Sequence, residues 1–421
     1  MNILLVSTSD LEGGAARATH RLLQGLRQNQ VPAQMLVQEK CGSDAAVVGV
    51  RATSGIHKAS VGLRLTLDQL PLKRYPQREP GAFSPQWLPD RTIAQIKQLN
   101  PDVVNLHWVN NGYLQIESLA ALAKPIVWTL HDMWAFTGGC HYNQECDRYT
   151  QSCGACPQLS SNRQTDLSRQ IWERKHKAWQ KLNLTIVTPS QWLADCARKS
   201  SLLNHCRIEC IPNGIDTNVY RPINRYVARD ILQLPQDKFL ILSGSLGGTS
   251  DTRKGFHLLK PALQALGRSG WHDRLELVVF GSNKPDNPPD LGLKTHYLGN
   301  FSDDCSLALL YSAADVFIAP SVQDNLPNTV MEAIACGTPC VAFKIGGIPD
   351  MIDHQYNGYL AEDFNAKDLA HGIIWILSDE ERYYKLSENS RNKALKYFSL
   401  RTLSENYHNI FNEVFEQQYL S

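Results

Sequence analysis

The sequence predicts an α/β protein made of two doubly wound, Rossmann-like domains whose parallel sheets face each other across a cleft. Three observations lead to this prediction. The chain has 421 residues, which is more than a single hydrophobic core usually organises. Short apolar runs alternate with longer amphipathic runs in both halves, as strands and helices do in parallel sheets that are covered on both faces. A cluster of turn residues at 210–222 separates the two halves.

The expected strands are short runs that are almost entirely apolar. They lie at 3–7, 33–38, 103–108, 125–132 and 184–190 in the first half, and at 239–245, 275–281, 316–321 and 339–343 in the second. Helical patterns fall between them. We therefore expect an N-terminal domain at 1–212, a C-terminal domain at 213–395, and a final helix at 396–421 that returns to the N-terminal domain.

The composition is that of an ordinary globular protein, with 43% hydrophobic and 20% charged residues. The net charge of +1 gives no electrostatic reason to expect a nucleic-acid partner. The apolar run in "MNILLVSTSD" is too short for a signal peptide or a membrane span, and no later run is long enough. We therefore expect a cytosolic protein, in which eleven cysteines serve as thiols or metal ligands rather than as a disulfide framework.

A pair of glycines, Gly13 and Gly14, stands between the first expected strand and the first expected helix. Glycines at this place let the backbone approach a ligand closely, and the start of a helix favours an anion. The pattern is not G-x-G-x-x-G, so it does not indicate a dinucleotide site. A plain turn is the alternative interpretation.

Two adjacent cations, Arg253 and Lys254, stand in a glycine-rich loop after the strand expected at 239–245. At the carboxyl edge of a parallel sheet such a pair suits a diphosphate, because arginine offers forked hydrogen bonds and lysine a point charge. The alternative is a solvated basic turn.

Two carboxylates surround the start of a short apolar helix after the strand expected at 316–321. Asp324 lies in the loop, and Glu332 lies in the helix, which Asn328 or Thr329 is expected to cap. Backbone N–H groups as far as Val330 would then offer an anion site. Carboxylates accept hydrogen bonds from paired sugar hydroxyls, so two at this spacing could hold two sugar rings. The alternative is that Glu332 only complements the helix dipole.

Four motifs together carry a resemblance to a known family. They are the acids Asp324 and Glu332, the run "EAIACGTPCVAF" (332–343), the run "YSAADVFIAPS" (311–321), and "IPNGID" (211–216). With these motifs the chain resembles the retaining glycosyltransferases of family 4, also called group 1 glycosyl transferases, which have the GT-B fold. The resemblance covers nearly the whole chain.

One departure from the family pattern indicates a branch. The first acid is usually a glutamate followed by Gly-Phe-Gly, whereas here Asp324 is followed by Asn325, Leu326 and Pro327. This variant resembles the branch that acts in exopolysaccharide and O-antigen assembly, such as the colanic-acid transferases. The resemblance implies that the C-terminal domain binds a nucleotide-diphosphate-sugar donor, and that the N-terminal domain faces a glycan or polyprenyl-linked acceptor.

The resemblance also assigns roles to residues. Arg253 and Lys254 match the cations that hold the donor diphosphate, Glu332 matches the acid that binds the donor ribose, and Asp324 matches the acid that binds the donor sugar. His131, in "TLHD", matches a histidine that binds the sugar near the reacting carbon, although a lone histidine is more often structural. The glycine pair near residue 13 matches the family's N-domain loop.

The resemblance implies transfer with retention of configuration and without an obvious protein nucleophile. The protein then stabilises the leaving diphosphate and orients both sugars. No Asp-x-Asp motif stands where a metal would bridge the diphosphate, so we expect metal-independent catalysis with no cofactor. The alternatives are a non-catalytic nucleotide-sugar-binding protein, or another GT-B enzyme such as an epimerase or a phosphorylase.

A cysteine-rich insertion is expected at 138–160. It contains Cys140, Cys146, Cys153 and Cys156, of which the last two form C-x-x-C. Four thiolates could enclose a structural zinc ion. The spacing is not that of a standard zinc finger, so reduced thiols and one or two disulfides remain as alternatives.

A basic segment at 57–78 mixes cationic and apolar residues. Members of the family often dock on membranes through basic surfaces of the N-terminal domain, and a basic amphipathic stretch could do so here. A solvated loop and helix is the alternative. The cations are Lys58, Arg64, Lys73, Arg74 and Arg78.

Overall fold

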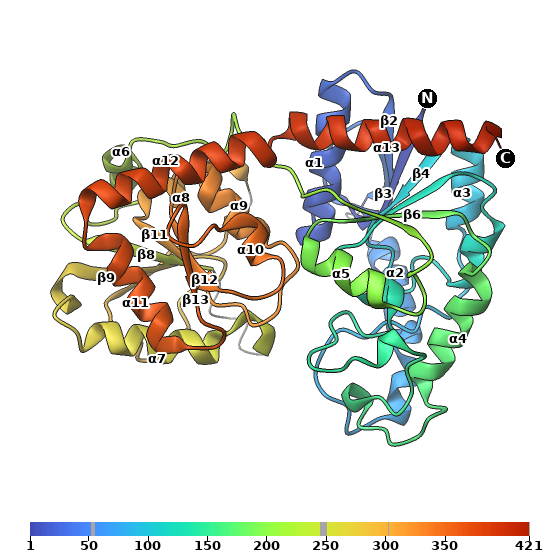
Figure 1. Ribbon diagram of the computed structural model, residues 1–421, viewed down its shortest axis with the longest axis horizontal. Coiled ribbons are helices and arrows are strands. Elements are labelled where there is room, and N and C mark those ends of the chain that lie inside the picture. The colour runs from blue at the N-terminus through green and yellow to red at the C-terminus, as the bar shows by residue number, and fades with distance from the viewer. Residues whose placement is uncertain (52–54, 245–250, 302, 421) are drawn as a thin grey trace. The chain divides into compact units, whose positions relative to one another are not determined.

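The computed structural model describes residues 1–51, 55–244, 251–301 and 303–420. The chain divides into two compact units (Figure 1). The N-terminal unit contains Met1–Asn213 together with Leu400–Ser421, and the C-terminal unit contains Gly214–Ser399. Each unit has its own parallel sheet covered by helices, and this confirms the predicted fold class.

The N-terminal unit is built on seven parallel strands among its described residues, in the order β3-β2-β1-β4-β5-β6-β7 (Figure 1). The strand order reverses between β1 and β4, and in such sheets ligands bind beyond the carboxyl ends of the strands at this point. The strands are β1 (Ile3–Ser9), β2 (Ala33–Lys40), β3 (Val47–Arg51), β4 (Val103–Leu106), β5 (Ile126–Thr129), β6 (Leu184–Thr188) and β7 (Arg207–Cys210).

Helices cover both faces of this sheet. Alternate residues of β1 therefore enter different cores: Leu4 and Val6 belong to one apolar cluster, whereas Ile3 and Leu5 belong to another. Burial on both faces explains why the strands are continuous apolar runs in the sequence. The helices are α1 (Gly14–Gln28), α2 (Gly55–Asp68), α3 (Thr92–Leu99), α4 (Leu167–Trp179), α5 (Gln191–Lys199) and α13 (Leu400–Leu420).

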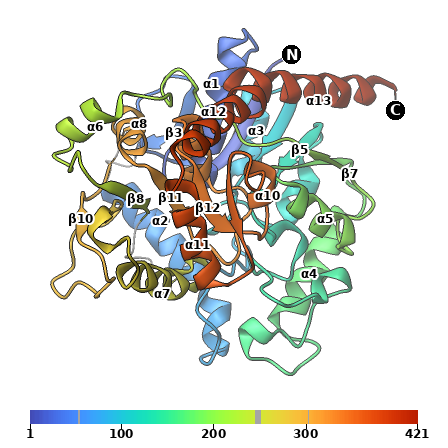
Figure 2. The ribbon, with the colours of Figure 1, turned by 60° about the vertical axis from the view of Figure 1, so that its left-hand side comes forward.

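The last helix, α13, packs against α1 and against strands β4 and β5 (Figure 2). Its apolar residues Leu403, Tyr407 and Phe411 share a core cluster with Leu22 of α1. The close approach depends on Gly25 of α1, where a Cβ atom would stand 2.8 Å from the carbonyl oxygen of Leu400. The C-terminal segment is thus an integral layer of the N-terminal unit.

The C-terminal unit is built on six parallel strands among its described residues, in the order β10-β9-β8-β11-β12-β13. Here the order reverses between β8 and β11. The elements are α6 (Arg225–Ile231), β8 (Phe239–Ser243), α7 (Phe256–Gly267), β9 (Leu275–Val279), β10 (Thr295–Tyr297), α8 (Asp304–Ala313), β11 (Val316–Ala319), α9 (Asn328–Ala335), β12 (Cys340–Phe343), α10 (Ile348–Met351), β13 (Gly358–Ala361), α11 (Ala366–Leu377) and α12 (Glu380–Tyr397).

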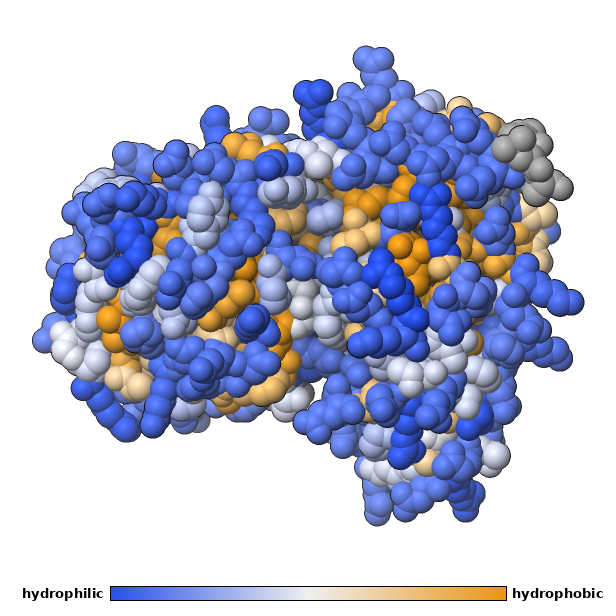
Figure 3. All heavy atoms as spheres, in the orientation of Figure 1, coloured by the Kyte–Doolittle hydropathy of each residue, from blue (hydrophilic) through white to orange (hydrophobic). Residues whose placement is uncertain are grey.

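The face seen in Figure 3 is mostly hydrophilic, with apolar residues showing between the polar ones. Among the helices in the described part of the chain, none combines the length and the apolar character that crossing a bilayer requires.

Candidate functional site

The predicted donor residues lie at the point where the strand order of the C-terminal sheet reverses. Arg253 and Lys254 follow β8 in a short 3-10 helix, Thr252–Lys254, and Asp324 follows β11. Since β8 and β11 are neighbours in the sheet, their carboxyl ends bring these residues to one edge. Part of the glycine-rich loop, 245–250, lies outside the described residues.

The structure pairs two of these residues directly. Lys254 Nζ lies 2.8 Å from Asp324 Oδ2; the carboxylate is nearly buried, whereas half of the lysine side chain is exposed. Arg253 makes a second ion pair, 2.7 Å long, with Asp251. The carbonyl of Arg253 accepts a hydrogen bond from the Val322 N–H. The loops after β8 and β11 are therefore joined by an ion pair and by a backbone hydrogen bond.

A glycine next to the lysine makes this contact between the loops possible. Gly255 has a φ of +72°, in the left-handed region that favours glycine. A Cβ atom at this position would overlap the carbonyl oxygen of Pro320, which follows β11. The backbone approach that places Lys254 beside Asp324 thus requires glycine at 255.

Replacing Gly255 with alanine is expected to destabilise the protein by roughly 2–4 kcal/mol, because the overlap and the left-handed backbone both oppose a side chain. Urea unfolding followed by circular dichroism measures this. Gly270→Ala is a matched control, since nothing lies within 4 Å of where its Cβ atom would stand. Equal unfolding midpoints for the two variants would contradict the packing argument.

Glu332 lies in α9 and is only 4% exposed. One of its oxygens, Oε2, accepts a hydrogen bond from the hydroxyl of the fully buried Tyr311, at 3.0 Å. Burial raises the pKa of Tyr311 well above its usual value, and the neighbouring carboxylate raises it further, so the phenol stays protonated and donates. Tyr311 thereby fixes the orientation of the Glu332 carboxylate.

The expectation that Asn328 or Thr329 caps α9 is wrong. The cap position is Pro327, and no side-chain hydrogen bond caps this helix within the described segment. The Pro327 carbonyl accepts the N–H of Val330 at 3.1 Å, so that amide already has a partner. Asn328 and Thr329 are instead the first two helical residues, because proline ends the loop in an extended conformation with φ −64° and ψ 120°.

A second glycine pair holds the backbone at Asp324. The N–H of Gly347 donates to the Asp324 carbonyl at 3.1 Å. Gly346 has a φ of +53°, and a Cβ atom there would also overlap that carbonyl. The position of the Asp324 carboxylate is therefore set from the loop after β12 as well as by Lys254.

In the N-terminal unit, Gly13 and Gly14 lie where the sequence predicts them, between β1 and α1. Gly13 is the cap residue of α1 and has a φ of +91°. Both glycines are exposed, and nothing lies within 4 Å of where a Cβ atom of Gly13 would stand. The open space at a helix start suits the close approach of a ligand.

His131 follows β5, and its neighbour is a histidine that sequence reasoning missed. His131 Nε2 lies 3.0 Å from Nδ1 of His107, which follows β4. Burial lowers the pKa of His131 to about 4 and that of His107 well below its usual value, so both rings are neutral near pH 7. The sequence held a signal for this pair, since a Leu-His dipeptide stands where each of two adjacent strands ends, at Leu106–His107 and Leu130–His131.

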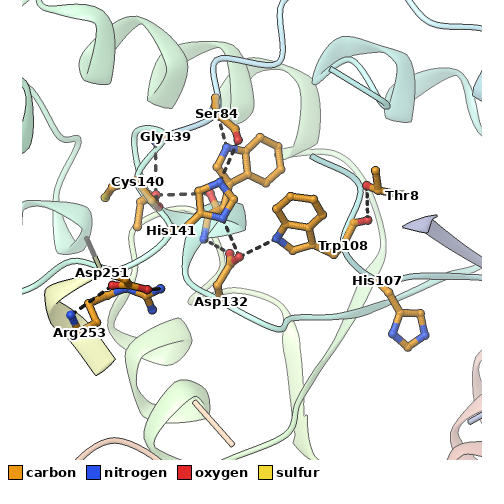
Figure 4. Close-up of polar contacts among 12 residues, drawn as sticks. Thr8, Ser84, His107, Trp108, Asp132, Gly139, Cys140, His141, Asp251 and Arg253 are labelled. Carbon is orange, nitrogen blue, oxygen red and sulfur yellow. Dashed lines mark hydrogen bonds and ion pairs between the residues drawn. The ribbon is translucent and has the colours of Figure 1, made fainter. Parts of the chain in front are cut away.

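Asp132 anchors the chain directly after His131 (Figure 4). Its carboxylate accepts hydrogen bonds from Trp108 Nε1 at 2.8 Å and from the Trp134 N–H at 2.8 Å, and it lies 2.6 Å from His141 Nδ1. The other ring nitrogen of His141 lies 2.8 Å from Ser84 Oγ. Burial tends to raise the pKa of Asp132, but His141 and the hydrogen bonds lower it overall. The network fixes the backbone that carries His131.

The four cysteines of the insertion line one small cavity of about 20 Å³. They are free thiols, and burial raises the pKa of Cys153 to about 12 and that of Cys156 to about 11. Within the described ranges, no three His, Cys, Asp or Glu side chains are grouped so that they could hold a metal ion. The zinc site that we expected at Cys140, Cys146, Cys153 and Cys156 is therefore unsupported.

The basic segment 57–78 contains most of α2 and a 3-10 helix, Leu70–Arg74. Lys73 and Arg74 are exposed, but Arg64 is engaged with the backbone carbonyls of Gly112 and Pro89. The side chain of Lys58 lies outside the described residues, and Arg78 donates to the carbonyls of Glu79 and Gly81. The exposed apolar residues of this surface are Leu63, Leu65, Leu67 and Leu70.

Comparisons with known proteins concern the family and the fold of the chain. Residues 12–219 match the family model described as Glycosyltransferase Family 4, and residues 227–393 match the model described as Glycosyl transferases group 1. A solved sucrose-phosphate synthase from Thermosynechococcus elongatus superimposes with a TM-score of 0.71 at 17% identity, over 99% of this chain and 100% of that one. At this identity the likeness shows the fold alone.

Two curated relatives are similar over shorter stretches. An N,N'-diacetylbacillosaminyl-diphospho-undecaprenol alpha-1,3-N-acetylgalactosaminyltransferase of Campylobacter jejuni is 31% identical over 33% of this chain and 41% of its own length. A putative colanic acid biosynthesis glycosyl transferase, WcaC, of Escherichia coli is 25% identical over 60% of this chain and 62% of its own length. The chain thus spans less than two thirds of the length of these relatives.

Proposed function

Since the chain belongs to the glycosyltransferases of group 1 and family 4, with the GT-B fold, we propose that it transfers a sugar from a nucleotide-diphosphate-sugar donor with retention of configuration. The observation that carries this proposal is the group of two cations and two buried acids on the C-terminal unit. Arg253, Lys254, Asp324 and Glu332 all belong to the loops and helix that follow β8 and β11.

Each of these groups has a task in the proposed reaction. Arg253 and Lys254 neutralise the diphosphate as it leaves, which lowers the energy of the transition state. Asp324 binds hydroxyls of the donor sugar, and Glu332 binds hydroxyls of the ribose. These hydrogen bonds to charged oxygens are stronger than neutral ones, and they orient the reacting carbon.

Side-chain cations take the place that a metal ion holds in many other transferases. Phosphate oxygens gain favourable interactions with a guanidinium and an ammonium without proton transfer. We therefore propose metal-independent catalysis. The acceptor hydroxyl attacks on the face from which the diphosphate leaves, so the protein supplies orientation and charge rather than a nucleophile.

For the acceptor we propose a glycan or a polyprenyl-linked sugar of cell-surface polysaccharide synthesis. The name of the Campylobacter relative includes a diphospho-undecaprenol, and that of the Escherichia relative refers to colanic acid. Leu63, Leu65 and Leu67 are exposed, and the exposed cations Lys73 and Arg74 follow them in the sequence. Such a surface suits contact with an anionic membrane that carries the acceptor.

The test is nucleotide release from a panel of UDP-, GDP- and ADP-sugars, with and without EDTA. We expect slow release from one donor that EDTA does not change. Binding without release, even when acceptor glycans are added, would favour a non-catalytic nucleotide-sugar-binding protein. Loss of release with EDTA would contradict metal-independent catalysis, and a failure to bind any donor would overturn the proposed function.

A further inference from the structure

Trp192 differs from the other tryptophans of the N-terminal unit in its indole N–H group. Each of the others donates this hydrogen to a protein oxygen, as Trp108 does to Asp132 Oδ2 at 2.8 Å. The described residues offer the Trp192 N–H no acceptor, and its nitrogen is not among their buried unpaired atoms. Trp192 is half-buried, so this N–H is open to a ligand. The tryptophans with a partner are Trp87, Trp108, Trp128, Trp134, Trp172 and Trp179.

Two contacts hold the Trp192 ring in place. Ser190 caps α5 by accepting a hydrogen bond from the Leu193 N–H at 3.2 Å, which sets the first turn of the helix. The Trp192 ring stacks on Tyr142, with the ring centroids 6.4 Å apart and the ring planes within 15° of each other. Part of the indole also packs against the apolar cluster that contains Leu193. A ring held in this way loses little conformational freedom when a ligand covers its exposed part.

An open hollow of about 490 Å³ adjoins Tyr142. Its lining begins at the next residue in the chain, Asn143, and includes Pro157. Gln158, which follows that proline, donates from Nε2 to the Tyr142 carbonyl at 2.7 Å. The hollow therefore meets the stacked rings from both sides of the chain. Its lining residues are Asn143, Gln144, Glu145, Cys146, Asp147, Arg148 and Pro157.

The charges of the hollow disfavour an anionic ligand. Glu145 and Asp147 contribute two exposed carboxylates, whereas Arg148 contributes one guanidinium. The guanidinium donates to the backbone carbonyls of Gly154, at 2.8 Å, and Ala155, so it is already engaged. Carboxylates accept hydrogen bonds from hydroxyls but repel phosphates and other carboxylates. The hollow thus suits a neutral ligand that carries hydroxyl groups.

The stacked rings and the hollow belong to the carboxyl edge of the N-terminal sheet. Trp192 lies in the first turn of α5, directly after β6, and Tyr142 lies in the segment that follows the neighbouring strand β5. In open α/β sheets, ligands bind outside this edge. An aromatic face beside polar groups suits a sugar ring, because its C–H groups pack on the indole while its hydroxyls reach the N–H and the carboxylates.

We propose that Trp192, together with Tyr142 and the hollow at 143–148, is a subsite for a neutral sugar residue of the acceptor glycan. All of these residues belong to the N-terminal unit. That the bound sugar is part of the acceptor rests on the proposed function, whereas the binding of a neutral sugar does not. The subsite favours an acceptor that already carries a neutral sugar over a bare polyprenyl phosphate.

Saturation-transfer difference NMR on the full-length protein tests the subsite with free saccharides as probes. The panel contains methyl glycosides of glucose, galactose, mannose and N-acetylglucosamine, neutral disaccharides of these sugars, and glucuronic and galacturonic acid. We expect contact with at least one neutral saccharide and weaker contact with the uronic acids. Trp192→Ala should weaken the binding of that saccharide about 10-fold, and Trp192→Phe, which keeps an aromatic face, should retain most of it.

Trp172→Ala is the matched control. Trp172 is also half-buried and stacks on a second ring, that of His176, with centroids 4.9 Å apart, but it lies in the middle of α4 rather than after a strand. This variant should bind the saccharide like the wild type. An equal loss in Trp172→Ala and Trp192→Ala would overturn the subsite.

Three further results would also overturn the proposal. They are no contact with any neutral saccharide, unchanged binding in Trp192→Ala, and equal contact with the uronic acids. A general loss of folding is recognised separately by circular dichroism. If the wild-type protein releases nucleotide from no donor, the proposed function fails, but saccharide binding still decides whether the subsite exists.

Discussion

Replacing Glu332 with alanine is expected to raise the dissociation constant for the nucleotide sugar at least about 100-fold. A charged carboxylate that accepts two hydroxyl hydrogen bonds contributes about 1.5–3 kcal/mol for each, and every 1.4 kcal/mol is a factor of about ten. The carboxylate is only 4% exposed, so water replaces it poorly when it is removed. Isothermal titration calorimetry with the donor identified by the panel measures the change.

Two variants separate binding from stability in this experiment. Glu332→Gln keeps an oxygen that can accept from the Tyr311 hydroxyl, which lies 3.0 Å from the glutamate, but it loses the charge. It should fold like the wild type and bind the donor with intermediate affinity. Tyr311→Phe removes the buried hydroxyl and should cost about 1 kcal/mol of stability, with a smaller effect on the donor. Unchanged affinity in Glu332→Ala would contradict the role of this carboxylate.

The fold could be predicted because of how the sheets are buried. Helices on both faces force strands such as β11 and β12 to be almost wholly apolar, and such runs stand out in a sequence. The first two predicted ranges, 3–7 and 33–38, were too short at their carboxyl ends, whereas 103–108 and 125–132 were too long and ran on past the strands to include His107 and His131. The short strand β10, with only half-buried residues, gave no such signal.

The predicted cap of α9 was wrong because it relied on the cap propensity of single residue types. Asn328 and Thr329 are good cap residues by type, yet Pro327 takes the position because its fixed φ ends the loop one residue earlier. Nothing in the residue types alone decides between these adjacent positions. Only the structure therefore shows how the first turn of α9 is oriented and which of its backbone amides already donate hydrogen bonds.

Which residues far apart in the chain pair with each other could also not be predicted from the sequence. Lys254 and Asp324 are 70 residues apart and meet only because the strand order reverses between β8 and β11. His107 and His131 meet because β4 and β5 are neighbours. Sequence reasoning found candidate residues through the loops that follow strands, but it could not tell which side chains would engage each other.

Lys254→Met is expected to lower the rate of transfer about 100- to 1000-fold, the range found when a group that stabilises developing negative charge is removed. The ammonium pairs with Asp324 at 2.8 Å, and half of the lysine side chain is exposed, so a diphosphate can approach it. Because the Asp324 carboxylate is nearly buried, removing its partner should also lower the melting temperature. Steady-state kinetics with the identified donor measures the effect.

Lys238→Met is the matched control, because Lys238 precedes the same strand, β8, and so stands at the opposite edge of the sheet. It should transfer sugar at the wild-type rate. The pair itself is tested by a double-mutant cycle with Asp324→Asn. If Lys254 also orients the aspartate, the double variant should lose less than the product of the two single losses. Independent effects would mean that the ion pair plays no part in catalysis and that each side chain acts on the donor alone.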